Sequence, residues 1–139
     1  MPRARFAEIL RLLADHDVEF VVVGMTAGIL HGAPVTTVDL DVVHRRSPEN
    51  VARLLGALPG HQLLTTSHGD LDCLGTIDQD RGYEELLEQT VEMRLANGRT
   101  VRVLSLRALI EAKERSGRPK DLAVLPVLRA TLDETQRCP

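Results

Sequence analysis

Acidic side chains at two places in the chain have the type and spacing of divalent-metal ligands. Asp39 and Asp41 are separated by one leucine in an otherwise apolar segment. Because alternate side chains of a β-strand project from the same face, we expect these two carboxylates to point the same way. Asp72 is a single acid inside another apolar segment that has the pattern of a strand. A buried carboxylate needs a partner, and a divalent cation is one that hard oxygen ligands hold well.

The chemistry that such carboxylates support depends on whether they line a cleft. Carboxylates on adjacent strands can hold two Mg²⁺ ions about 4 Å apart, and these ions activate a hydroxyl and neutralise phosphate charge. Asp39, Asp41 and Asp72 therefore predict phosphoryl or nucleotidyl transfer. On a solvent-exposed strand face, water would screen their repulsion and they would carry no chemistry. Asp70 is a second choice, because it follows Gly69 and suits a turn.

A buried strand that ends in glycine precedes the acidic pair. Phe20–Val23 is a β-branched apolar run, typical of an interior strand, and it stops at Gly24. A short helix is predicted over Ala27–His31, and the free N–H groups at a helix N-terminus could receive a triphosphate. The glycine alone is equally consistent with an ordinary turn.

The remaining patterns alternate between helix and strand. Helices are predicted over residues 4–16, from 47 to 58, from 106 to 117 and from 119 onward, with a short acidic helix or turn over 83–89. Strands are predicted over 38–43, 62–66 and 70–77, with a hairpin of residues 91–95 and 101–103. This order predicts a single α/β domain of the α+β type over residues 1–139, with helices that flank a mixed sheet.

Composition excludes several classes of protein. The chain has 17 basic and 20 acidic residues, a net charge of −3 and 2% aromatic residues. A protein that follows a nucleic-acid backbone by bulk charge, or that stacks bases on an aromatic sheet, is therefore not expected. No apolar run approaches the roughly 20 residues that span a bilayer, which predicts a cytoplasmic protein that does not bind a membrane. Cys73 and Cys138 lack metal-ligand spacing, so both are expected to be reduced thiols.

The order of Gly24, Asp39, Asp41 and Asp72 resembles the nucleotidyltransferase superfamily typified by DNA polymerase beta. In that superfamily an apolar strand ends in Gly-Gly or Gly-Ser, an Asp-x-Asp pair follows, and a third acid lies on a later strand. The segments that carry the likeness look like the small bacterial branch with minimal nucleotidyltransferases and type IV toxin–antitoxin enzymes. These segments are residues 20–27, 30–34, 39–43, 109–113 and 117–121.

The resemblance implies a function and a set of roles. It implies a nucleotidyltransferase-like fold and a Mg²⁺-dependent transfer of a nucleoside monophosphate from a nucleoside triphosphate to an RNA, a protein or a small molecule. The catalytic and metal-binding roles of a two-metal site fall on Asp39, Asp41 and Asp72. Contacts to the nucleotide fall on Gly24, Met25, Thr26 and Lys113.

Lys113 and Asp121, in the C-terminal part of the chain, are a further basic and a further acidic candidate. Lys113 follows Ile110 by three residues and therefore lies on the apolar stripe of its helix. It either points into the cleft, where it would steady phosphate charge, or snorkels at the margin of the stripe. Asp121 lies in the first turn of the last predicted helix, where its charge is favourable to the helix dipole.

Met25 is the position where the chain departs from the superfamily pattern, which has a second glycine or a serine there. The alternative function is therefore a catalytically impaired nucleotide-binding module, or a toxin–antitoxin partner, with the same fold. A chain of 139 residues leaves little room for a domain that recognises the acceptor. We expect a second copy of the chain or a small helical partner protein to supply that surface.

Overall fold

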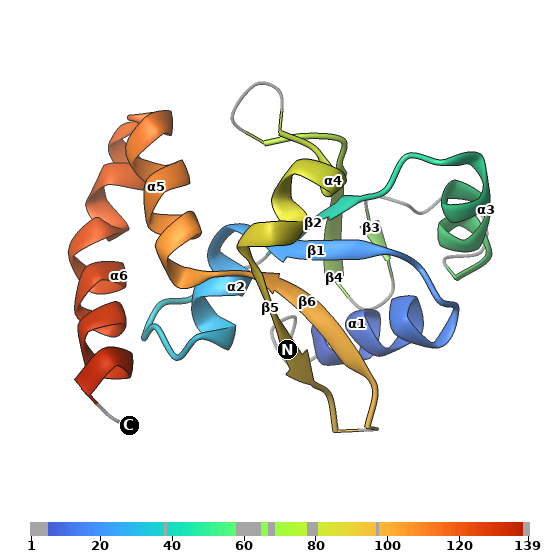
Figure 1. Ribbon diagram of the computed structural model, residues 1–139, viewed down its shortest axis with the longest axis horizontal. Coiled ribbons are helices and arrows are strands. Elements are labelled where there is room, and N and C mark those ends of the chain that lie inside the picture. The colour runs from blue at the N-terminus through green and yellow to red at the C-terminus, as the bar shows by residue number, and fades with distance from the viewer. Residues whose placement is uncertain are drawn as a thin grey trace.

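A six-stranded mixed sheet forms the centre of the computed structural model (Figure 1). The structure describes residues 6–37, 39–57, 65–66, 69–77, 81–96 and 98–137. Within these residues the strand order is β3-β4-β2-β1-β6-β5. The strands are β1 (Phe20–Val23), β2 (Asp39–His44), β3 (Thr65–Thr66), β4 (Gly69–Leu74), β5 (Thr90–Arg94) and β6 (Thr100–Leu104).

Parallel and antiparallel pairs alternate across the sheet. β1 pairs antiparallel with β2 and parallel with β6. β2 pairs parallel with β4, and the outer strands β3 and β5 pair antiparallel with β4 and β6. The sequence-based expectation of an α/β fold with a mixed sheet is therefore confirmed.

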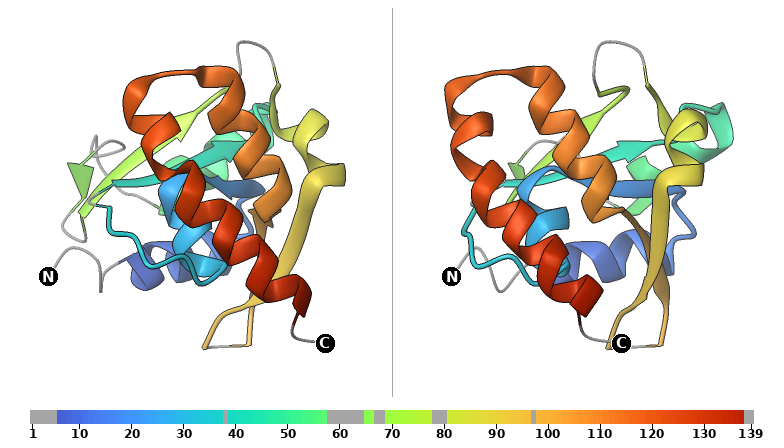
Figure 2. Two further views of the ribbon diagram at one scale, coloured as in Figure 1. Left: turned by 90° about the vertical axis from the view of Figure 1, so that its left-hand side faces the viewer. Right: turned by 60° about the vertical axis from the view of Figure 1, so that its left-hand side comes forward.

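Helices lie on both sides of the strands and at one end of the sheet. In Figure 1, α1 lies below the strands and α4 above them, and the views of Figure 2 show α5 and α6 packed together in front of α2. The helices are α1 (Phe6–Asp15), α2 (Gly24–Leu30), α3 (Pro48–Ala57), α4 (Tyr83–Leu86) with the 3₁₀ turn Leu87–Gln89, α5 (Leu106–Ser116) and α6 (Pro119–Arg137).

Local sequence signals fix the ends of the helices. The hydroxyl of Ser47 accepts a hydrogen bond from the backbone N–H of Asn50 at 3.3 Å, and Ser105 caps α5 through the N–H of Ala108 at 3.1 Å. Both serines satisfy an N–H group that has no partner inside its helix. Gly117 ends α5 in the left-handed conformation, with φ +66°.

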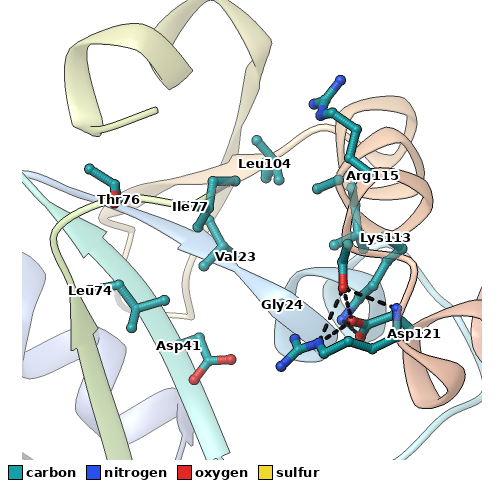
Figure 3. A pocket seen from close by; sticks show the side chains of 14 residues that line it. Val23, Gly24, Asp41, Leu74, Thr76, Ile77, Leu104, Lys113, Arg115 and Asp121 are labelled. Carbon is teal, nitrogen blue, oxygen red and sulfur yellow. Dashed lines mark hydrogen bonds and ion pairs between the residues drawn. The ribbon is translucent and has the colours of Figure 1, made fainter. Parts of the chain in front are cut away.

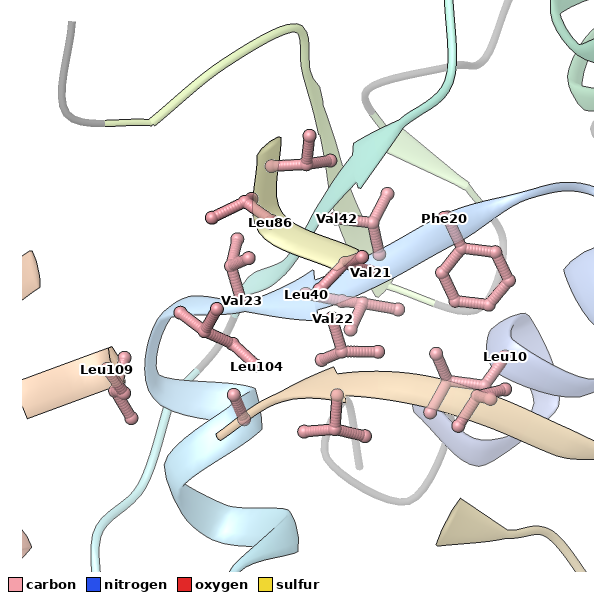
Figure 4. Close-up of a cluster of buried hydrophobic side chains, with 14 of the residues drawn as sticks. Leu10, Phe20, Val21, Val22, Val23, Leu40, Val42, Leu86, Leu104 and Leu109 are labelled. Carbon is pink, nitrogen blue, oxygen red and sulfur yellow. The ribbon is translucent and has the colours of Figure 1, made fainter. Parts of the chain in front are cut away.

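The hydrophobic core explains why β1 is apolar throughout. All four residues of β1 are buried, because both faces of this central strand are covered. Figure 4 shows Phe20 and Val22 packed among side chains of α1, β2 and β6, with Leu104 and Leu109 at the end nearest α5. A central strand that packs on both faces holds β2, and with it Asp39 and Asp41, in a fixed position.

Several element boundaries differ from the sequence-based prediction. α2 begins at Gly24 rather than Ala27, so the turn and the helix start coincide. β4 ends at Leu74 rather than Ile77, which instead forms an isolated bridge with Arg81. β3 contains only residues 65–66, and residues 62–64 of the predicted strand lie outside the described part of the chain. Among the residues that the structure describes, no helix is long and apolar enough to cross a membrane.

Asn50 joins α3 to the sheet, and its removal is expected to destabilise the fold. Its fully buried side chain accepts from the N–H of Glu19 at 2.6 Å and donates to the carbonyls of Glu19 and Arg45 at 2.9 and 2.8 Å. Asn50→Ala leaves these buried groups without partners, so the free energy of unfolding should fall by about 2–4 kcal/mol. Urea unfolding measures this, with exposed Glu49→Ala as a control that should change it by less than about 0.5 kcal/mol. Equal effects of the two variants would contradict the role of Asn50.

Candidate active site

The register of the central strands brings the acidic positions next to one another. Asp39 pairs with Asp70, and Asp41 pairs with Asp72, across the parallel strands β2 and β4. On the other side of β2, Asp41 pairs with Val23, the last residue of β1. The two acidic segments, in β2 and β4, are therefore neighbours in the sheet. They lie beside the end of β1 that leads into Gly24.

Gly24 lies against the carboxylate of Asp41. Its φ is +68°, a conformation that L side chains rarely adopt. A Cβ atom at this position would lie 2.6 Å from Oδ2 of Asp41, closer than two nonbonded atoms can approach. The backbone conformation favours glycine here, and a side chain at this position would force the Asp41 carboxylate to move.

A pocket of about 570 Å³ opens between Asp41 and the α5–α6 pair. Figure 3 shows Asp41 and Gly24 on the sheet side and Lys113 and Asp121 on the helical side. The rest of the lining is mostly apolar and includes two exposed arginines. It consists of Val23, Leu74, Thr76, Ile77, Leu104, Leu109, Ala112, Arg115, Ser116 and Arg118.

Lys113 lines the pocket and forms an ion pair with a buried acid. Its Nζ lies 2.9 Å from Oδ1 of Asp121, and the Lys113 side chain is 15% exposed. Of the two interpretations of Lys113, the structure supports the one in which the side chain lies in the cleft. An ammonium group has three donors, so a bond to Asp121 leaves Lys113 able to bind an anion as well.

Asp121 is the centre of a hydrogen-bonded cluster rather than only a partner of the helix dipole. Its side chain is 2% exposed and receives bonds from Lys113, from the hydroxyl of Ser116, and from Nε of Arg118 at 2.8 Å. Burial alone would raise the pKa of this carboxyl, but the bonds from Ser116, Lys113 and Arg118 outweigh it and hold the pKa well below its usual range. Asp121 is therefore ionised and fixes the direction of two basic side chains at the pocket.

Met25 and Thr26, both predicted nucleotide contacts, do not line this pocket. The Met25 side chain packs against the hydrophobic core. Thr26 is buried, and its hydroxyl donates to the carbonyl of Asp39 at 3.0 Å, which joins α2 to β2. The structure thus gives Thr26 a positioning role toward the acidic strand, and Met25 leaves the pocket open.

The structure describes the side chains of two of the three predicted catalytic acids, Asp39 and Asp41. Asp41 lines the pocket, and Asp39 lies one alternation earlier on the same strand face. The side chain of Asp72 lies outside the described part of the structure, and only its backbone register is known. Within the described residues, no group of three or more histidine, cysteine or acidic side chains has the arrangement of a metal site.

Sequence reasoning missed the cluster around Asp121 and the apolar lining of the pocket. Arg118 and Asp121 are spaced for contact within one helical turn, and this spacing was the available signal. Ser116 and Lys113 reach Asp121 only because α6 folds back along α5, and no local pattern predicts that. Leu74 and Ile77 come from the end of β4 and the segment after it, which the sequence assigned to one strand.

Gly24→Ala is expected to damage both stability and the site. The positive φ should cost about 1–2 kcal/mol of unfolding free energy, and the added methyl must displace the Asp41 carboxylate. Gly98→Ala is the matched control, because Gly98 has φ +88° and no atom within 4 Å of the added Cβ. Urea unfolding should show similar losses for both variants, whereas binding of a Mg²⁺–nucleotide should fall only in Gly24→Ala. Equal nucleotide binding by the two variants would contradict the role of the Gly24–Asp41 contact.

Comparisons with protein-family models, with curated proteins and with solved structures found no match to this chain.

Proposed function

We propose that this protein is a Mg²⁺-dependent nucleotidyltransferase, which moves a nucleoside monophosphate from a nucleoside triphosphate to an acceptor. The observation that carries the proposal is the pocket itself, with the Asp41 carboxylate beside Gly24 on one wall and Lys113 on the opposite wall. The resemblance of the Gly24, Asp39, Asp41 and Asp72 pattern to polymerase-beta-like nucleotidyltransferases supports it as well.

The donor set in the pocket fits magnesium. Asp41 presents carboxylate oxygens to the cavity, Asp39 shares its strand face, and position 72 is the neighbour of Asp41 in the register. Mg²⁺ prefers oxygen ligands and is held in phosphate-transfer enzymes by one or two carboxylates together with phosphate oxygens. Asp39, Asp41 and Asp72 would hold the ions. When bound, the metal would supply charge neutralisation on the phosphates and a lowered pKa of the acceptor hydroxyl.

The opposite wall fits the triphosphate. Lys113 and Arg118 provide positive charge, and both are oriented by Asp121. A guanidinium has five donors, of which Nε of Arg118 serves Asp121. Oriented donors that require little reorganisation stabilise developing negative charge most effectively.

The proposed reaction is a substitution at the α-phosphorus. A hydroxyl oxygen of the acceptor forms a bond to the α-phosphorus, and the bond from that phosphorus to the oxygen bridging to the β-phosphate breaks. Pyrophosphate leaves with the electron pair of the broken bond. The proton of the acceptor hydroxyl passes to a carboxylate, and Asp72 is the proposed base. Lys113 and Arg118 stabilise the negative charge that grows on the departing pyrophosphate.

For the acceptor and for the surface that recognises it, we keep the predictions made from the sequence. An RNA, a protein or a small molecule would provide the hydroxyl, and a second copy of the chain or a small helical partner would help to hold it. A nucleoside triphosphate substrate fits the proposed cytoplasmic location.

Transfer of label from nucleotides tests the proposal directly. The protein is incubated with Mg²⁺, α-³²P-labelled nucleoside triphosphates and a panel of acceptors, which comprises total RNA, the protein itself, a protein mixture and small hydroxyl compounds. We expect incorporation of label and release of pyrophosphate, both abolished by EDTA. The absence of both transfer and nucleotide binding would contradict the proposal. Nucleotide binding without transfer would favour the alternative, a nucleotide-binding or toxin–antitoxin partner module.

A further inference from the structure

We infer that the nucleobase of the substrate lies on an aliphatic wall of the pocket and is not read through its hydrogen-bonding edge, so that all four ribonucleoside triphosphates bind with similar affinity. This inference rests on the proposed function, because it places one part of a nucleotide in the same pocket. It adds a prediction about how far the site discriminates among nucleotides, which the sequence resemblance does not give.

The two ends of the pocket differ in polarity. Figure 3 shows Asp41 and Asp121 toward one end, and Thr76, Ile77 and Leu104 toward the other. A metal ion and charged phosphates belong at the end with Asp41, where the carboxylate and the oriented basic side chains lie. The apolar part of a nucleotide is its base, so the base belongs at the end with Ile77.

Figure 3 places Ile77 and Leu104 at the apolar end, and the aliphatic lining of the pocket as a whole comes from three segments. Leu104 ends β6, Leu109 and Ala112 come from α5, and Ile77 follows β4. Leu104 and Leu109 are buried, which makes this wall part of the rigid core rather than a mobile surface. The half-buried side chains of Ile77 and Ala112 offer apolar surface to a base. Contact with them depends on the area of the base and not on its hydrogen-bonding edge.

Aromatic stacking is absent from this site. The chain has two phenylalanines, one tyrosine and no tryptophan. Phe6, Phe20 and Tyr83 are all described and all buried, and none of them lines the pocket. Base–aromatic stacking is the usual source of affinity for an unpaired base, so its affinity here must come from aliphatic contact and from the phosphates.

Among the described residues, the polar groups at this end are poorly suited to distinguish bases. The backbone N–H and carbonyl of Ile77 already bond to Arg81, at 2.8 and 3.0 Å. The Thr76 hydroxyl can donate or accept, so it adapts to any base edge, and Arg115 only donates, which every base can accept. A site built to bond a specific edge discriminates by about 10⁴-fold or more, whereas contacts of this kind should hold differences among bases within about tenfold.

Equilibrium binding by calorimetry tests the inference with five probes and Mg²⁺. The probes are ATP, GTP, CTP, UTP and inorganic tripolyphosphate. We expect the four nucleotides to bind within about tenfold of one another. Ala112→Trp takes up space beside the aliphatic lining of the pocket and should weaken all four nucleotides at least about tenfold, while tripolyphosphate binds as before. Ala52→Trp, on an exposed position of α3, is the matched control and should change none of the five.

Each outcome has a distinct meaning. One nucleotide that binds more than about tenfold tighter than the others would overturn the inference, because the base edge would then be read. The inference also fails if Ala112→Trp leaves nucleotide binding unchanged, or weakens tripolyphosphate as much as the nucleotides. Tripolyphosphate binding that needs neither Mg²⁺ nor Asp41 would instead contradict the proposed function. Thr76→Val gives a second variant with little steric change, and we expect the order of the four affinities to stay the same.

Discussion

Asp41→Asn is expected to lower nucleotidyl transfer at least about 100-fold without unfolding the protein. Asparagine has the size of aspartate but lacks its charge, so it is a poor ligand for Mg²⁺. Asp41 lines the pocket and lies against Gly24. The loss should therefore appear both in the rate of transfer and in the affinity for Mg²⁺–nucleotide.

The control for Asp41→Asn separates the site from general loss of charge. Asp133→Asn removes an exposed acid of α6 outside the pocket and should leave the rate within about twofold. Circular dichroism and urea unfolding would show that both variants fold. If Asp41→Asn raised stability and left Mg²⁺–nucleotide binding unchanged, the acids would be a solvated strand face, which is the alternative that the sequence left open.

Asp121→Ala should cost about 3–5 kcal/mol of unfolding free energy, because it leaves a buried charge without its partner. The Asp121 side chain is 2% exposed, and its loss leaves the ammonium of Lys113 without its partner in a wall where water has little access. Urea unfolding measures the loss. The double variant Lys113→Met with Asp121→Leu should recover much of it, because apolar side chains of similar size can replace a buried ion pair.

The same double variant distinguishes structure from function. The stability of the double variant should be near that of the wild type. Its binding of tripolyphosphate should be weaker than that of the wild type, because the pocket has lost Lys113. Full recovery of binding together with stability would show that Lys113 has only a structural role. A loss below about 1 kcal/mol for Asp121→Ala would show that the cluster is not important for the fold.

The stability that Asp121 contributes should depend on pH in a defined direction. The pKa of this carboxyl is lowered in the folded protein from its usual 3.8, so the folded state binds the proton less tightly than the unfolded state. The contribution is therefore fully present above pH 3.8 and is lost as the pH falls below that value toward the folded pKa. The difference in unfolding free energy between wild type and Asp121→Asn should therefore shrink as the pH falls below about 3.8. A difference that grew in acid would contradict this assignment.

Sequence patterns predicted those parts of the site that depend on local geometry. The period-two pattern around Leu40 gave Asp39 and Asp41 one strand and one face, which β2 confirms. Gly24 was predicted to end an interior strand, and it does. These features follow from neighbouring residues, and so they can be read without knowing the fold.

The other parts depend on residues that meet only in the folded chain. Thr26 bonds to the carbonyl of Asp39, and this partner depends on how α2 packs on β2. Asp121 has the local signal of a helix-dipole residue, but its bond to Lys113 requires the return of α6 along α5. Ile77 joins the pocket because β4 ends early, at a point that its apolar pattern does not mark. Pairings of this kind are set by topology, and a single sequence does not determine topology through local periodicity.

Binding of Mn²⁺ in place of Mg²⁺, followed by electron paramagnetic resonance in the presence of a non-hydrolysable nucleoside triphosphate, tests the central claim most directly. The claim is that Asp39 and Asp41 hold a divalent ion at the pocket. The account predicts that wild-type protein removes the signal of free Mn²⁺ in proportion to its concentration, and that Asp39→Asn and Asp41→Asn each weaken this binding at least about tenfold. Equal Mn²⁺ binding by the wild type and both variants would contradict it.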